Sequence, residues 1–138
     1  MLDYKLNWLV DKRVLHLQIT DKYNLKTLQQ MVPSVKAMID AGSAPVQVVW
    51  DMSGITQMPR NIREPVHELS VLKDHPNGGW IVMISNNVMM RFAGQIATVF
   101  LGAKYRSVAT YDEAVETICR IEPNVADALK QALPASLH

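Results

Sequence analysis

The sequence has little of what several classes of protein require. Its single cysteine, Cys119, excludes an internal disulfide and fits a reducing compartment. Lysine and arginine number 14 against 13 aspartates and glutamates, so the net charge of +1 gives no overall attraction to nucleic acid or to anionic membranes. The first residues have no basic segment followed by an apolar one, so we expect no secretory signal and a cytoplasmic protein.

Long apolar runs and low-complexity segments are also missing. The most apolar window, residues 88–101, is interrupted by Arg91, Gln95 and Thr98 and is too short to span a bilayer. Repeats and linkers do not stand out. A chain of 138 residues that is 49% apolar and 20% charged therefore predicts a single globular domain over residues 1–138.

Two short apolar runs predict buried strands. Residues 46–51 form a mainly apolar run that ends in the acid Asp51, and residues 80–84 form a second, continuous apolar run; a strand covered on both faces needs such a run. Alternating patterns at residues 4–10 and 15–19 predict an opening hairpin, and residues 105–108 a short edge strand.

Helical periodicity fills the segments between these strands. Asn24 can cap a helix that is kinked at Pro33 and ends at Gly42, and Thr110 opens the clearest capping box. Helices are also expected over residues 62–72, 88–101 and, lastly, 125–132, before Pro134. Strands that alternate with helices predict an α/β fold with a mixed, mainly parallel sheet of about five strands. An antiparallel amino-terminal hairpin lies at one edge of it, and helices pack on the sheet.

Two local patterns resemble the STAS domain, the fold of sulfate transporters and anti-sigma-factor antagonists. Residues 48–56 are similar to that family's strand ending in aspartate and followed by a Ser-Gly-Val-Thr-like turn. Residues 109–115 are similar to its threonine-capped final helix. Residues 80–117 resemble the stand-alone SpoIIAA-like branch, in which STAS and lipid-binding Sec14-type folds are grouped. The resemblance implies a bacterial signalling module that works through protein contacts.

The sequence departs from that family at the phosphorylated position. Phosphorylated members carry Asp-Ser-Ser-Gly at the start of the helix after the turn, whereas residues 59–62 here read Pro-Arg-Asn-Ile. The phosphoacceptor position falls at Asn61, which can cap a helix but cannot be phosphorylated. If the family role is kept, its usual switch is missing.

Chemistry at Asp51 has several possible forms, none with a complete motif. The acid could be a general base, a metal ligand or a phosphorylated nucleophile, but the partner acids that phosphatases and receiver domains need are missing. A triad of Asp51, Ser53 and His67 or His75 lacks the Gly-x-Ser-x-Gly elbow. We favour an Asp51 that bonds its own turn, and expect no catalytic residue, metal or cofactor.

Two further residues receive structural interpretations. His16 should face away from the apolar row of its strand, as a solvated or rim histidine. Cys119, on an apolar helix face, should be a buried inert thiol.

Two surfaces are candidates for function. A rim near the end of the first buried strand could hold an anion or an acidic partner at a helix amino terminus. Its residues are Asp51, Ser53, Thr56, Arg60, Asn61 and Arg63. The helix over residues 88–101 could form an interface or the wall of an apolar pocket, through Met89, Met90, Phe92, Ile96 and Phe100. Alternatively this helix is core, with its second side covered by the carboxyl-terminal helix.

We therefore expect a non-catalytic regulatory module with a protein partner, which could also form a homodimer. The alternative is a binder of a small lipid-like ligand, held between the sheet and the helix over residues 88–101. An enzyme ranks third, because it rests only on Asp51 and a nearby histidine.

Overall fold

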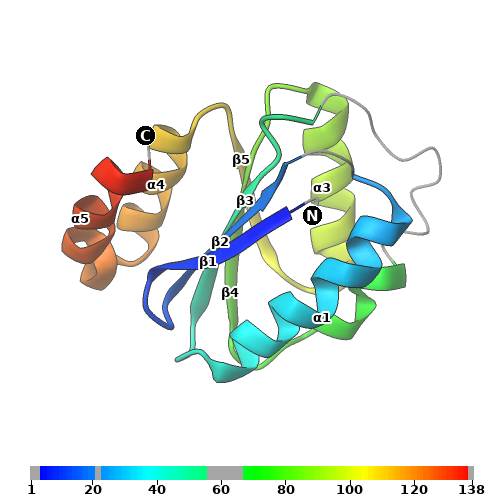
Figure 1. Cartoon of the computed structure of the whole chain (residues 1–138), viewed down its shortest axis with the longest axis horizontal. Helices are drawn as coiled ribbons and strands as arrows, with labels where there is room; N and C mark the ends of the chain where they lie inside the picture. The colour runs from blue at the N-terminus through cyan, green and yellow to red at the C-terminus, as the bar shows by residue number, and fades with distance from the viewer. Residues whose placement is uncertain (1–3, 21–22, 56–66, 137–138) are drawn as a thin grey trace.

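The computed structural model describes residues 4–20, 23–55 and 67–136, without the side chains of residues 132–136. Five strands alternate with helices in the order that the sequence predicts (Figure 1). The strands are β1 (Tyr4–Val10), β2 (Val14–Ile19), β3 (Val46–Asp51), β4 (Gly78–Ile84) and β5 (Lys104–Val108). The helices are α1 (Leu25–Ala41), α3 (Val88–Leu101), α4 (Tyr111–Ile121) and α5 (Ala126–Ser136), with short 3₁₀ turns η1 (Ser70–Leu72) and η2 (Pro123–Val125).

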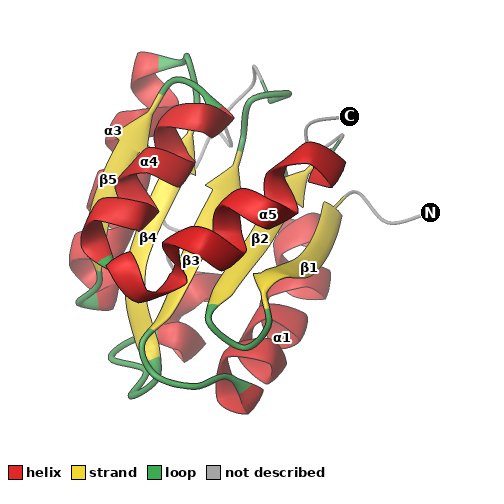
Figure 2. Cartoon of the chain, turned by 90° about the vertical axis from the view of Figure 1, so that its left-hand side faces the viewer, coloured by secondary structure: helices red, strands yellow, loops and turns green. Residues whose placement is uncertain are grey.

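The sheet has the strand order β1-β2-β3-β4-β5, with β1 antiparallel to β2 and all other pairs parallel. Helices α1 and α3 lie on one face, and α4 and α5 lie on the other, as Figures 1 and 2 show from two sides. The predicted mixed sheet, its opening hairpin and the edge position of the last strand are confirmed.

Two apolar clusters hold these layers together. On the α1 and α3 face the cluster includes Leu15, Leu28 and Trp50, and on the α4 face it includes Val49, Val82 and Ile118. Every residue of β3 is buried, and its apolar side chains enter both clusters: Val46, Val48 and Trp50 enter the first, and Val49 enters the second. The face of β3 that carries Val49 also carries Gln47 and Asp51, two buried polar residues that are hydrogen-bonded within the protein.

The caps predicted at the amino ends of two helices are present in the structure. Asn24 accepts a bond from the Thr27 amide, and Thr110 accepts one from the Glu113 amide. Helix α1 is one helix that continues through Pro33, as expected. The expectation that the last helix ends before Pro134 is wrong, because α5 runs to Ser136. Proline removes one hydrogen bond and crowds the preceding turn, but only two helical residues follow Pro134, so the cost falls at a helix end, where the backbone frays.

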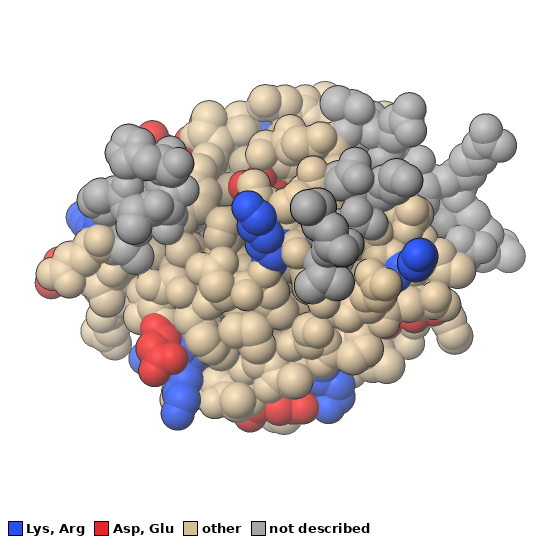
Figure 3. Space-filling model, in the orientation of Figure 1, with Lys and Arg blue, Asp and Glu red and all other residues tan. Residues whose placement is uncertain are grey.

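Charges are thinly spread over the face seen in Figure 3, with both signs present and broad uncharged areas between them. In the part of the chain that the structure describes, no helix is long and apolar enough to cross a membrane.

Candidate functional site

The Asp51 turn lies at the carboxyl edge of the sheet, where β3 ends. Asp51 Oδ1 accepts hydrogen bonds from the Ser53 amide at 2.9 Å and from the Ser53 hydroxyl at 2.6 Å. The Met52 amide bonds the Ile84 carbonyl of β4, and the Ile55 amide bonds back to Met52. The acid thus closes the turn that follows its own strand, as we expect for aspartate in this position.

His16, which the sequence predicted to be solvated or at the rim, lies against this turn. Its Nε2 is 3.9 Å from Asp51 Oδ2, and its ring meets the edge of the Tyr111 ring at a centroid distance of 5.5 Å. The side chains of His16 and Asp51 are 13% and 10% exposed. Of the two environments predicted for His16, solvated or at the rim, the structure shows the second, because Asp51 and Tyr111, the first residue of α4, lie against its ring.

The surroundings of Asp51 keep it ionised at neutral pH. Burial raises the pKa of Asp51, but the contacts with His16 and Ser53 outweigh burial and hold the pKa below its ordinary value. The Ser53 hydroxyl points at the acid, so it is not arranged as a nucleophile with His16 as its base.

The other histidines considered for a triad lie elsewhere. His75 Nε2 is 2.5 Å from Asp40 Oδ1, and its Nδ1 accepts the Asn77 amide, so the ring ties α1 to the loop before β4. His67 is exposed on a helical turn. Among residues 4–20, 23–55 and 67–131, no three His, Cys, Asp or Glu side chains are placed to hold a metal ion.

The structure describes two residues of the predicted rim. Asp51 is buried and Ser53 is exposed, but Thr56, Arg60, Asn61 and Arg63 lie outside the described residues. The anion-binding rim therefore stays a prediction. Cys119 is half-buried and free, so the fully buried thiol that we expected is wrong.

Helix α3 is held to the sheet by its inner side. Asn87 caps its first turn, and Gly102 ends it with φ +70°. The Tyr105 hydroxyl donates to the Arg91 carbonyl at 2.9 Å, and Arg91 Nε donates to the Ser85 carbonyl at 2.8 Å. Gly94 lies so close to β4 and β5 that a Cβ there would be 2.7 Å from Met83 Cε.

The outer side of α3 is apolar and exposed. We call it the α3 surface; its members are Val88, Met89, Phe92, Ile96, Val99 and Phe100, with exposed fractions of 75, 63, 58, 39, 72 and 43%. Met90, which we grouped with them, is buried at 1% exposed. The alternative that the carboxyl-terminal helix covers this side is wrong, because α5 lies across the sheet from α3 (Figure 2).

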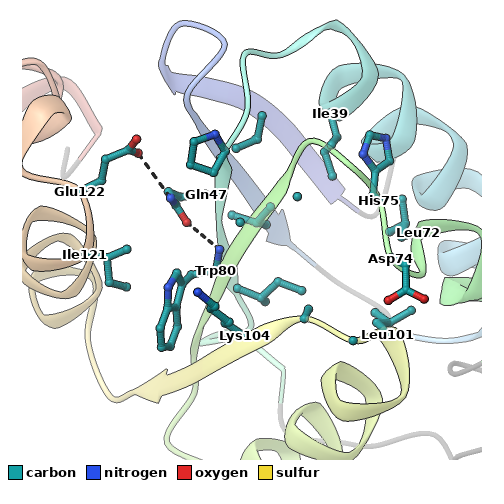
Figure 4. A pocket seen from close by; sticks show the side chains of 18 residues that line it. Ile39, Gln47, Leu72, Asp74, His75, Trp80, Leu101, Lys104, Ile121 and Glu122 are labelled. Atoms are coloured by element: carbon teal, nitrogen blue, oxygen red, sulfur yellow. Dashed lines mark hydrogen bonds between the residues drawn. The ribbon is translucent and has the colours of Figure 1, made fainter.

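A hollow at the amino ends of β3, β4 and β5 was not predicted. It has a volume of about 400 Å³ and is lined by polar and apolar side chains (Figure 4). At its wall, Gln47 accepts the Trp80 amide at 2.6 Å and donates to Glu122 at 3.4 Å, and Glu122 pairs with Arg13. A glutamine within an otherwise apolar run was the available signal.

The space between the sheet, α1 and the end of α3 is nearly filled. The hollow there has a volume of about 40 Å³ and is lined by apolar residues such as Val35, Trp50 and Leu101. Pockets that hold small ligands have volumes of roughly 300–1,000 Å³. In the described parts of the chain, no room for a lipid-like molecule therefore exists at this hollow.

Comparisons with known proteins support the fold. No protein-family model matches the chain, and no curated protein matches it. Among solved structures, it is similar to an uncharacterized protein from the DUF3478 family with a SpoIIAA-like fold from Shewanella loihica PV-4. The TM-score is 0.60 at 13% sequence identity, and the match covers 84% of this chain and 92% of that one. The fold is therefore SpoIIAA-like, in agreement with the STAS resemblance.

Proposed function

We propose that this chain, with its SpoIIAA-like fold, is a non-catalytic cytoplasmic regulatory module that binds a protein partner through the α3 surface. The exposure of that surface carries the proposal. With about 200 Å² for a whole large apolar residue, the exposed fractions amount to roughly 700 Å². The largest apolar patch on an ordinary monomer measures about 300–600 Å², and larger ones mark interaction sites.

The composition of the α3 surface also suits a protein partner. Phenylalanine and methionine are enriched at interface cores, where charged side chains are depleted. Arg91 is the charged residue within α3, and its side chain is bonded back to Ser85 at the edge of the sheet. Lys73, whose Nζ lies 5.1 Å from the centre of the Phe100 ring, provides a polar margin at one end.

The Asp51 turn is the second part of the proposal. Its buried carboxylate fixes the turn, and Arg60 and Arg63 follow in the sequence, so we expect this rim to contact acidic side chains of the partner. The missing phosphoacceptor at Asn61 means that phosphorylation at that site does not control the contact.

Photo-crosslinking tests the proposal. A chain with benzoylphenylalanine in place of Phe92 should form a covalent adduct with protein in a lysate of the source cells. The same group in place of the exposed Ala128 of α5 serves as the control. Adducts would then be digested and identified by mass spectrometry. Equal, low protein labelling from both positions would refute the proposed function.

Charge reversal tests the rim separately. R60E/R63E should reduce the yield of the Phe92 adduct if arginines at the rim steer an acidic partner. An unchanged adduct yield would exclude the rim from the contact and leave the α3 surface in place.

The alternative, a lipid-like ligand between the sheet and α3, has less support because the hollow where the sheet meets α1 and the end of α3 measures about 40 Å³. Native mass spectrometry of the purified chain should give the mass of the apo protein. A retained apolar molecule, with a rise in Tm on adding fatty acids, would favour the alternative.

A further inference from the structure

The exposed apolar residues of the α3 surface are spaced symmetrically along the sequence about position 94. Val88 and Phe100 are equidistant from position 94, and so are Met89 and Val99, and Phe92 and Ile96. When two identical helices pack antiparallel about a two-fold axis, residues that are equidistant from the axis in opposite directions face one another. A two-fold axis at position 94 would therefore pair every exposed apolar residue of α3 with another one.

Gly94 lies on the opposite side of the helix, toward the sheet. It is buried, and a Cβ there would be 2.8 Å from the Tyr105 hydroxyl and 2.7 Å from Met83 Cε. The axis would thus run between the two helices at the level of position 94, past the outer side of α3 between Phe92 and Ile96, at the centre of the α3 surface. That centre is the region an interface buries most completely.

Charge does not oppose such pairing. The Arg91 side chains of two copies would lie about 9 Å apart along the helices, six residues at 1.5 Å each. Each is already bonded to its own Ser85 carbonyl. Antiparallel helices also place opposite ends of their dipoles together. Nothing within the α3 surface itself offers a charge that a charged partner could recognise.

The area also fits. If each copy contributes roughly 700 Å² of apolar surface, the pair buries about 1,400 Å² in total, within the range of about 1,200–2,000 Å² for stable specific interfaces. Neighbouring copies would use the same patch, which closes the assembly at two chains.

We propose that the partner of the α3 surface is a second copy of this chain, with α3 packed antiparallel on α3 of that copy about a two-fold axis at position 94. This inference rests on the proposed function and names its partner. In the homodimer Phe92 packs against Ile96 of the second copy, and Val88 lies level with Phe100 of that copy along the helix axes.

The oligomeric state is the first test, by size-exclusion chromatography with light scattering on the purified chain. Twice the chain mass of 15.5 kDa is expected for the wild type at about 50 μM. I96E brings two carboxylates near the axis and should raise the dissociation constant at least ~100-fold, whereas A128E on α5 should leave it unchanged. Circular dichroism and thermal melts check that both variants fold.

Cysteine crosslinking tests the register, in a C119S background. A mixture of V88C and F100C chains should form a covalent dimer with a short bis-maleimide, because these positions face each other. V88C alone or F100C alone should not form this covalent dimer. The equivalent cysteines of two identical copies would be separated by about 18 Å along the helix axes, twelve residues at 1.5 Å each.

Each result decides the inference. A monomeric wild type at 50 μM, a dimer that persists in I96E, or crosslinking of V88C with itself would overturn it. The proposed function is judged separately. If the wild type is monomeric while benzoylphenylalanine at position 92 captures a different protein, the inference fails and the function stands. If position 92 captures no protein, the function fails as well.

Discussion

Replacement of Gln47 is the sharpest test of how the sheet is held at its amino end. The register between β3 and β4 shifts by one residue there: Val46 pairs with Gly78, whereas Val48 pairs with Ile81. The extra residue in β4 leaves the Trp80 amide without a carbonyl in the ladder, and Gln47 Oε1 accepts it at 2.6 Å. Gln47 is 2% exposed.

Gly79 permits this arrangement. A Cβ at Gly79 would be 2.5 Å from Gln47 Oε1 and 2.9 Å from the Val46 carbonyl oxygen. Such distances are far below contact range, so the glutamine amide occupies space that a glycine leaves open. Gln47 Nε2 then reaches Glu122, which pairs with Arg13 and ties the end of α4 to the sheet.

Q47L keeps the approximate volume of the side chain and removes the acceptor. An unpaired buried donor costs about 1–3 kcal/mol, and the long 3.4 Å bond to Glu122 adds little. The apolar gain of leucine offsets part of this, so we expect the free energy of unfolding to fall by about 2 kcal/mol. With a urea m-value of about 2 kcal/mol/M, the midpoint should fall by about 1 M.

Urea denaturation followed by circular dichroism measures this shift. Q131L makes the same chemical change at an exposed position of α5 and should stay within about 0.5 kcal/mol of the wild type. If Q47L were as stable as Q131L with an unchanged m-value, the assignment of the Trp80 amide to Gln47 would be refuted.

Q47E keeps the hydrogen-bond acceptor at position 47 and adds a negative charge, so it tests the effect of charge at this position. It preserves an oxygen for the Trp80 amide but places a second carboxylate beside Glu122, so it should be destabilised at pH 7. Two adjacent buried carboxylates can share a proton, so stability should recover as the pH falls toward 5. A Q47E protein whose stability does not improve on acidification, relative to the wild type, would contradict this geometry.

Other predictions concern the two faces of the sheet. The pKa of Asp51 is lowered in the folded state, so its contribution to stability is complete above the unfolded value of about 4 and is lost as pH falls through the folded pKa. The stability advantage of the wild type over D51N should therefore shrink on acidification, in urea titrations at several pH values; a constant difference would contradict it. I118A removes a side chain that is 0% exposed and should cost about 2–5 kcal/mol, with the exposed E116A as control. N24A should cost about 1 kcal/mol in thermal melts, because the Thr27 amide loses its cap; no change would show that water replaces it.

Much of the fold follows from local features of the sequence. The apolar runs at residues 46–51 and 80–84 predict central strands, and Asn24 and Thr110 are strong caps because their side chains satisfy free amides. Alternation of strands and helices then leaves few ways to order the sheet. The antiparallel β1 and the edge strand β5 were predicted on this basis.

The candidate surfaces depended on contacts that no local pattern contains. Met89 and Met90 are adjacent in one apolar helix, yet one is exposed and the other buried, because the sheet approaches only one side of α3. The sequence predicts an apolar helix but not which neighbour covers it, and α5 packs on the far face of the sheet.

The Asp51 turn combines both kinds of information. By itself the sequence determined that an acid ends a buried strand and bonds its own turn, since both interactions span only a few residues. The tertiary structure alone decided that His16, from a strand 35 residues earlier in the sequence, lies 3.9 Å from that acid beneath Tyr111. Local hydrogen bonds can be predicted from sequence spacing, whereas a contact between strands depends on their register and on the helix that covers them.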